Sequence, residues 1–180
     1  MNICIFIILF AINLGFVLSE TSVIVVINHN TCCKVEKFLI DKFEADVTPV
    51  YKQFLNECLE ELNLTDVEKI ELGKSSACII ECIGLKANII TANKRMNETG
   101  FRNVVNEIPL EEHQKAVAEE TITKCMEKVR SLPEIVINGC TTMTIRADHC
   151  IAMEFFKSCP VEKQDTSKIC VDLREHINKM

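Results

Sequence analysis

The sequence predicts an all-α fold: a compact domain of about six to eight helices, held by disulfide bonds around an apolar cavity. Three observations predict it. The chain has only five glycines and four prolines, and no proline lies between Tyr51 and Ile108, so long stretches are free to be helical. Apolar residues recur at spacings of three and four, which is the helical period. Eleven cysteines in 180 residues indicate a disulfide framework.

Composition excludes several classes of protein. Hydrophobic residues make up 48% of the chain and charged residues 26%, which excludes disorder and a collagen-like fibre. The net charge is −6 and no basic run occurs, whereas a nucleic-acid binder needs a basic surface. A length of 180 residues fits a single domain.

The first residues read as a signal peptide. Residues 3–18 are apolar and uncharged, and Val17-Leu18-Ser19 suits signal-peptidase cleavage after Ser19. A transmembrane anchor is the alternative, but no Lys/Arg cluster follows to stop transfer. Removal of residues 1–19 discards Cys4 and leaves ten cysteines, an even number typical of five disulfides in a secreted chain. No later run is long enough to span a membrane, so we expect a secreted, extracellular protein.

The first elements follow from short patterns. The run 23–27 favours extended backbone. A helix is expected to start at Thr48-Pro49, because proline suits the first helical turn, and four apolar residues then recur every four positions: Val50, Phe54, Cys58 and Leu62. Thr65 and Glu68 have the spacing of a capping box, which predicts a short helix ending near Gly73.

The remaining elements complete the helical domain. Residues 75–90 are apolar nearly all round, which predicts a helix buried by its neighbours, whereas 111–130 carries one apolar stripe and basic residues in its last turns. Two further helices are expected over 147–157 and 167–178. Between them, 93–100 reads as a polar connector and Ile135-Val136-Ile137 as a short extended piece.

The cysteine spacings restrict which elements can be joined. Cys78 and Cys82 are four residues apart on one helix, so both point off the same face and each must reach a different element. Cys150 and Cys159 are nine apart, about two and a half turns, so they face roughly opposite sides.

These spacings resemble the cysteine signature of insect odorant-binding proteins, the family of pheromone-binding and general odorant-binding proteins. The pattern is Cys58-x19-Cys78-x3-Cys82-x42-Cys125 followed by Cys150-x8-Cys159. The paired Cys32-Cys33, the Cys140-x9-Cys150 spacing, the Cys159-Pro160 pair and Cys170 are similar to the plus-C subfamily. The fourteen residues between Cys125 and Cys140 are fewer than this subfamily usually has.

The resemblance implies a non-enzymatic carrier of small hydrophobic, odorant- or pheromone-like molecules through extracellular lymph, with a sensory receptor or a second copy of the chain as further partners. It implies the core bonds Cys58–Cys82, Cys78–Cys150 and Cys125–Cys159. The implied organisation is a signal peptide (1–19), an N-terminal extension carrying Cys32 and Cys33 (20–46), a core (47–159) and a C-terminal extension tied by Cys170 (160–180). A secreted protein-interaction module or inhibitor built on the same disulfide cage is the alternative.

Four cysteines remain once those core bonds are assigned. Adjacent cysteines rarely bond to each other, because the geometry across one peptide is strained. We therefore expect Cys32 and Cys33 each to bond with one of Cys140 and Cys170, in an order that spacing does not decide.

The residue pattern gives little support for an enzyme or a metalloprotein. Asp148-His149-Cys150 are successive residues on an expected helix, so their side chains diverge by about 100° and cannot act as a triad. The Cys78-x3-Cys82 pair lacks the second ligand pair of a zinc site. We expect no catalytic residue, metal or cofactor.

The expected ligand pocket is apolar, because tryptophan is absent and Tyr51 is the only tyrosine. Aliphatic, Met and Phe side chains on the inner helix faces would line it: Phe54, Ile80, Ile83, Ile122, Met126, Met153 and Phe156. Two sequons, at Asn63 and Asn97, are candidate glycosylation sites in a secreted chain.

Overall fold

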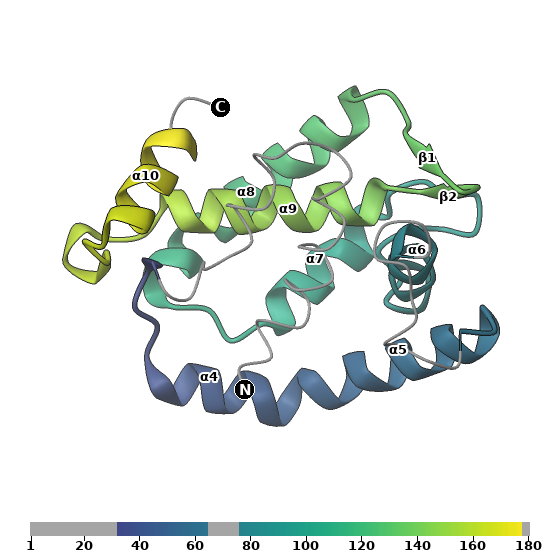
Figure 1. The fold of residues 1–180 in the computed structure, drawn as a ribbon, viewed down its shortest axis with the longest axis horizontal. Helices are drawn as coiled ribbons and strands as arrows, with labels where there is room; N and C mark the ends of the chain where they lie inside the picture. The colour runs from purple at the N-terminus through teal and green to yellow at the C-terminus, as the bar shows by residue number, and fades with distance from the viewer. Residues whose placement is uncertain (1–31, 65–75, 178–180) are drawn as a thin grey trace.

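Seven α-helices and one short hairpin make up the part of the chain that a computed structural model describes, residues 32–64 and 76–177 (Figure 1). The fold is all-α, as predicted. Its elements, in chain order, are α4 (Lys37–Asp46), α5 (Thr48–Glu61), α6 (Ser76–Lys86), α7 (Glu98–Glu107), α8 (Glu112–Ser131), β1 (Val136–Ile137), β2 (Cys140–Thr141), α9 (Met143–Lys157), the 3-10 turn η2 (Val161–Lys163) and α10 (Lys168–Ile177).

Most expected helices are present close to their predicted bounds. The helix expected at Thr48-Pro49 is α5, with Pro49 in its first turn. Residues 111–130 form α8, and the apolar stripe predicted there is buried from Ala118 to Val129. The expected extended piece at 135–137 is β1, which pairs with β2 through an Asn138-Gly139 turn where both residues have positive φ. The elements predicted over 23–27 and 65–73 lie outside the described residues.

Two helices were not predicted. Helix α4 lies in the segment taken as an N-terminal extension, and α7 begins inside the stretch read as a polar connector. Helix α7 buries only three residues, among them Phe101 and Val105, so its apolar stripe is narrow. The connector prediction for 93–100 was therefore wrong in its last residues, where α7 begins.

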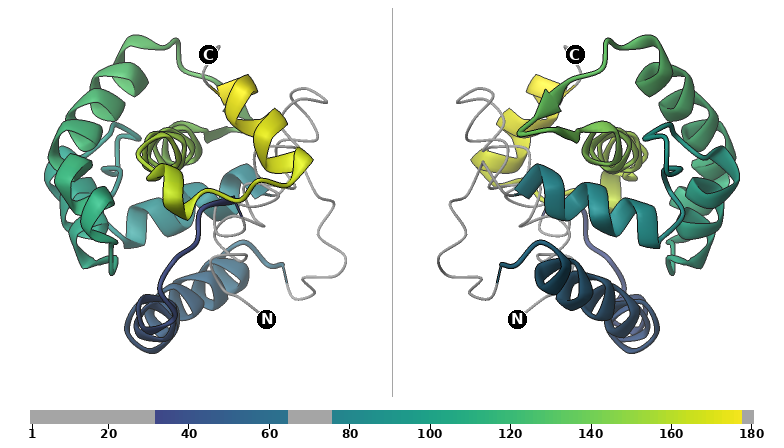
Figure 2. Two further views of the ribbon diagram at one scale, coloured as in Figure 1. Left: turned by 90° about the vertical axis from the view of Figure 1, so that its left-hand side faces the viewer. Right: turned by 90° about the vertical axis from the view of Figure 1, so that its right-hand side faces the viewer.

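The helices form two groups that α6 connects. Helix α5 packs against α4 and α6, while α9 packs against α6, α8 and α10. Figure 2 shows α4 and α5 on one side of the molecule, with α8, α9 and α10 on the other. Helix α6 is not covered all round as predicted, because Leu85 on its outer face is 40% exposed.

The hydrophobic interior is divided into three clusters. The central cluster joins α7, α8 and α9 around Ile122 and Met126. A C-terminal cluster joins Met153 and Phe156 of α9 to Leu173 of α10. A third cluster lies between α5 and α6, around Leu59 and Ile79. The third cluster links α5 to α6 and to no residue of α7, α8 or α9 among the described residues.

The start and the end of the described chain lie together. The Lys34 N–H donates to the Lys163 carbonyl at 2.9 Å, and the Asp165 N–H donates to the Cys32 carbonyl at 3.0 Å. The buried Glu111 carboxylate reinforces this junction, because it accepts hydrogen bonds from the Glu36 N–H (2.6 Å) and from Lys163. The two terminal extensions are thereby fastened to the start of α8.

Candidate functional site

Five disulfides connect the ten cysteines of the described chain, and their pairing differs in part from the expected one. The Cys58–Cys82 bond is present as expected, between α5 and α6. The expected bonds Cys78–Cys150 and Cys125–Cys159 are wrong. The other four bonds are Cys32–Cys170, Cys33–Cys159, Cys78–Cys140 and Cys125–Cys150.

Helix packing explains both errors. Helices α8 and α9 lie side by side, which brings Cys125 and Cys150 to a Cα–Cα distance of 5.6 Å. Cys78 on α6 faces β2 and not α9, so it reaches Cys140, at a Cα–Cα distance of 5.0 Å. As their spacings predict, Cys78 and Cys82 bond to different elements, and so do Cys150 and Cys159.

Of the two bonds formed by Cys32 and Cys33, one agrees with the prediction and one does not. Cys32 bonds with Cys170, one of the two partners predicted for it. Cys33 bonds with Cys159 and not with Cys140 or Cys170, because Cys33 forms a β-bridge with Gln164, five residues after Cys159. The expected bonding of Cys33 to Cys140 or Cys170 is therefore corrected.

The seven expected pocket residues are not gathered in one place. Ile122 and Met126 lie in the central cluster, Met153 and Phe156 in the C-terminal cluster, and Ile83 beside the third cluster. Ile80 is half-buried on α6. Phe54 on α5 is also half-buried, and its ring packs edge-on against that of Tyr51, with ring centroids 6.2 Å apart.

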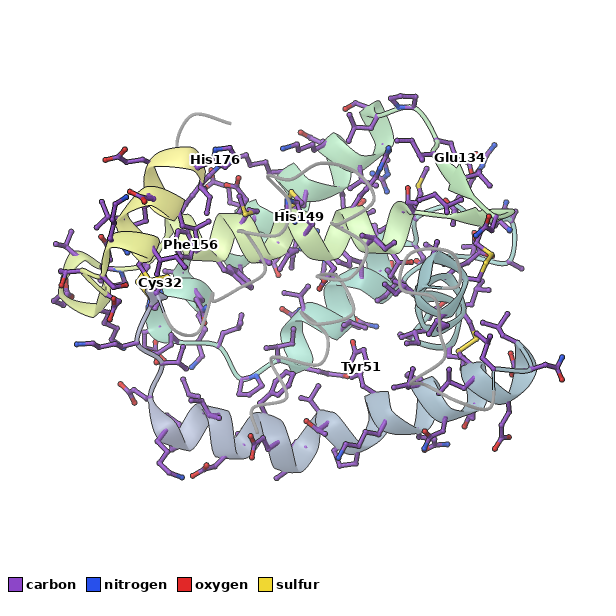
Figure 3. All side chains as sticks on the ribbon, viewed as in Figure 1. Cys32, Tyr51, Glu134, His149, Phe156 and His176 are labelled. Atoms are coloured by element: carbon purple, nitrogen blue, oxygen red, sulfur yellow. A yellow bond between two sulfur atoms is a disulfide. The ribbon has the colours of Figure 1, made fainter. Side chains whose placement is uncertain are left out.

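Two half-buried polar side chains, one on α5 and one on α9, have strongly raised pKa values. Desolvation raises the pKa of Asp148, on α9, to about 7. Desolvation also raises the pKa of Tyr51, on α5, and the charges of Asp148 and Glu107 raise it further. Figure 3 shows Tyr51 extending from α5 toward α7. These three side chains come from α5, α7 and α9, so the three helices converge on one region.

Neither of the two side chains has a hydrogen-bond or salt-bridge partner among the described residues. Two other carboxylates on α6 and α9 are different. Glu81 on α6 accepts hydrogen bonds from the Thr141 N–H and is 3.0 Å from Lys94 Nζ. Glu154 on α9 is paired with two lysines. Asp148 is therefore exceptional among the carboxylates of this region.

Sequence reasoning missed this pair, although one signal was present. Ile145, Asp148, Ala152 and Phe155 are spaced three, four and three residues apart, so they lie along one stripe of α9. Asp148 interrupts that apolar stripe. From the sequence alone, Asp148 is notable only as a neighbour of His149 and Cys150, and Cys150 is bonded to Cys125.

The two sequons differ in exposure. Asn63, at the end of α5, is exposed and has a positive φ of 54°. Asn97 precedes α7 and is half-buried, with its amide near Gly100. The exposed Asn63 side chain is the better placed of the two for a glycan.

Within residues 32–64 and 76–177, no group of three or more His, Cys, Asp or Glu side chains is arranged to hold a metal ion. In the same part of the chain, every helix is too short or too polar to cross a bilayer.

Comparisons with known proteins identify no relative of this chain. No protein-family model matches the sequence, and no curated protein or solved structure is significantly similar to it. The likeness to odorant-binding proteins therefore stays a prediction that rests on the cysteine spacings.

Proposed function

We propose that the protein is a secreted carrier of small hydrophobic molecules, of the insect odorant-binding type. The cysteine spacings and the helical, disulfide-bonded architecture support this proposal. The ligand would lie between α5 and the layer of α7 and α9, and not among the residues of the closely packed central cluster.

The observation that carries the proposal is the cysteine pattern, which lies on helices joined by disulfides. Tyr51 on α5 and Asp148 on α9 are half-buried, and desolvation is the first cause of both raised pKa values. We take these two partly shielded polar side chains as the edge of the proposed ligand space.

The disulfides are the physical means of keeping such a space open. A domain of this size normally closes its interior, because an empty cavity costs about 24 cal/mol per Å³. Each disulfide lowers the entropy of the unfolded chain and contributes about 3 to 5 kcal/mol by the chain-entropy model for loops of this length. The bond Cys58–Cys82 fixes α5 to α6 at the side of the proposed space.

Uptake of an apolar fluorescent probe by the oxidised protein, residues 20–180, tests the proposal. We expect reversible uptake of N-phenyl-1-naphthylamine with a Kd on the order of micromolar, and displacement by medium-chain apolar or aromatic molecules. Reduction and alkylation of the disulfides should weaken the uptake. No uptake between pH 5 and pH 8 would overturn the proposal, and a stoichiometric complex with another protein would favour the interaction module.

A pair of variants locates the site. Ala152→Trp adds a large ring on the stripe of α9 that carries Asp148, so it should reduce uptake. Val161→Trp is the matched control, because Val161 is 82% exposed on η2. The chain has no tryptophan, so each new ring is also the sole tryptophan fluorophore and reports its own contact with the probe. Equal loss of uptake in both variants would place the site elsewhere.

A further inference from the structure

The five disulfides of the described chain differ in how far their cysteines are buried. Three of them join two buried cysteines: Cys32–Cys170, Cys33–Cys159 and Cys125–Cys150. In Cys58–Cys82, Cys58 is buried and Cys82 is half-buried. In Cys78–Cys140, which we call the hairpin disulfide, both cysteines are half-buried. Among these five bonds, the hairpin disulfide alone has no buried cysteine.

The hairpin disulfide lies at an open turn of the chain. Both of its sulfur atoms are 3.9 Å from the carbonyl oxygen of Asn138, an exposed residue of the turn between β1 and β2. A Cβ atom on the next residue, Gly139, would meet nothing within 4 Å. Figure 1 shows the hairpin beside α6 at the end of the molecule away from α10. A small thiol in solution therefore reaches these sulfur atoms without separation of the helices.

The sulfur that leaves distinguishes the hairpin disulfide from Cys58–Cys82. Exchange expels one sulfur as a thiolate, and a thiolate is costly where water does not reach it. Attack on the half-buried Cys82 expels Cys58, which is fully buried. The Glu61 carboxylate, 3.6 Å from Cys82 Sγ, also repels an incoming thiolate, although its ion pair with Lys86 weakens this repulsion. Attack on either sulfur of the hairpin disulfide expels a half-buried cysteine.

The hairpin has other attachments to the molecule that remain when this disulfide is open. The Thr141 N–H donates to the buried Glu81 carboxylate of α6. The Lys94 ammonium donates to the Gly139 carbonyl at 2.9 Å and is paired with Glu81 at 3.0 Å. Because these contacts lie on both sides of Cys140, we expect the hairpin to keep its place beside α6 after reduction.

We propose that the hairpin disulfide is a site of thiol–disulfide exchange on the folded protein, and that its substrate is a dithiol. One thiolate of the dithiol attacks Cys78 Sγ or Cys140 Sγ, forms a mixed disulfide with it and expels the other cysteine as a thiolate. The second thiolate of the dithiol then attacks the dithiol's own sulfur in the mixed disulfide and expels the remaining cysteine.

The dithiol leaves as a cyclic disulfide, oxidised by two electrons, and the protein is reduced by the same two electrons. The two protons that the dithiol loses end on Cys78 and Cys140. The exchange site does not depend on the proposed carrier function.

Timed reduction of the oxidised protein, residues 20–180, by dithiothreitol at pH 8 without denaturant tests the exchange site. Samples are blocked with N-ethylmaleimide, unfolded, fully reduced and labelled with heavy N-ethylmaleimide, so that peptide mass spectrometry gives the reduction rate of each cysteine. We expect Cys78 and Cys140 to be released together, at least about tenfold faster than any other pair, because a buried sulfur slows both attack and departure. Far-UV circular dichroism should be unchanged after this first step.

Two double variants assign the fast step to its bond. Replacing Cys78 and Cys140 together by alanine should abolish the fast release of thiols, while the other four pairs react at their wild-type rates. The matched control replaces Cys125 and Cys150 together by alanine, which removes a disulfide between buried cysteines. In that control the fast release from the hairpin should be unchanged.

Two results would overturn the exchange site. If Cys58 and Cys82, or any other pair, are released before the hairpin disulfide, the argument from the leaving sulfur is wrong. If all five pairs are released together, exchange requires unfolding of the whole domain, and the folded protein has no exchange site. Neither result bears on the carrier function, which uptake of the fluorescent probe tests separately.

Discussion

Replacement of Gly84 by alanine tests how closely α6 and α9 approach each other. A Cβ atom at Gly84 would lie 2.3 Å from Thr144 Oγ1, 3.0 Å from Thr144 Cγ2 and 3.2 Å from Thr144 Cβ. The shortest of these contacts is about 1 Å below the ordinary range, so the two helices must move apart or Thr144 must turn.

The expected magnitude is the balance of two effects. Overpacking of this kind costs about 1 to 3 kcal/mol. Alanine in place of glycine inside a helix contributes about 1 kcal/mol in favour of folding. We therefore expect Gly84→Ala to lower the free energy of unfolding by up to about 2 kcal/mol.

Gly84→Ala should no longer lower the free energy of unfolding when Thr144 is also replaced. Thr144→Ala removes Oγ1 and Cγ2 and leaves only the mild contact at 3.2 Å. It also removes a buried hydroxyl that has no hydrogen-bond partner among the described residues, so no favourable bond is lost. In this background Gly84→Ala should be neutral or slightly stabilising, since only the gain in helix propensity remains.

Urea unfolding of the four proteins, followed by far-UV circular dichroism with the disulfides intact, measures this double-mutant cycle. We expect a coupling free energy of about 2 kcal/mol between the two sites. If Gly84→Ala changes the stability equally in both backgrounds, within about 0.5 kcal/mol, the close approach of α6 to Thr144 is refuted.

Three further predictions follow from the same structure. Gly100→Ala should lower the free energy of unfolding by more than Gly84→Ala does, because its Cβ would lie 1.8 Å from the Asn88 carbonyl oxygen, a backbone atom. A normal yield and an unchanged urea midpoint would contradict this. Asp148→Asn should raise the free energy of unfolding at pH 8 and not at pH 3. The folded pKa is about 7 against 3.8 unfolded, so wild-type stability falls as pH rises through this window. A difference that is independent of pH would refute the desolvation of this carboxyl. Replacing Cys125 and Cys150 together by alanine should lower the free energy of unfolding by roughly 3 kcal/mol, measured by urea unfolding, while exchange of the exposed Asn63 for glutamine should leave it unchanged.

Patterns in the sequence predicted the helices that are specified by residues close together in the chain. Helix α5 begins at Thr48 with Pro49 in its first turn, and α8 buries its predicted stripe, because these features depend on the chain within a few residues. Helix α7 was missed because Gly100 argues against a helix there. A tertiary contact requires glycine at this position, because any side chain there would collide with the backbone of Asn88.

The disulfide pairing and the position of the candidate site were beyond local reasoning. The spacing of Cys78 and Cys82 showed that they reach different elements, but it could not show that β2 turns toward α6 and presents Cys140 there. In the same way, Asp148 stood out from its apolar stripe, but no local pattern shows that its charge acts on Tyr51 of α5. Both facts depend on contacts between residues far apart in the chain.

The order of the disulfides along the chain has a consequence for how the protein withstands proteolysis. Two bonds, Cys32–Cys170 and Cys33–Cys159, span almost the whole described chain and close it into a ring. Inside that ring the loops closed at separations of 24, 62 and 25 residues overlap in sequence, so every peptide bond between 58 and 150 lies in at least one of them. A protease that cuts once anywhere in that range leaves two fragments joined by at least three covalent bonds. A single nick in that range therefore releases no piece of the molecule.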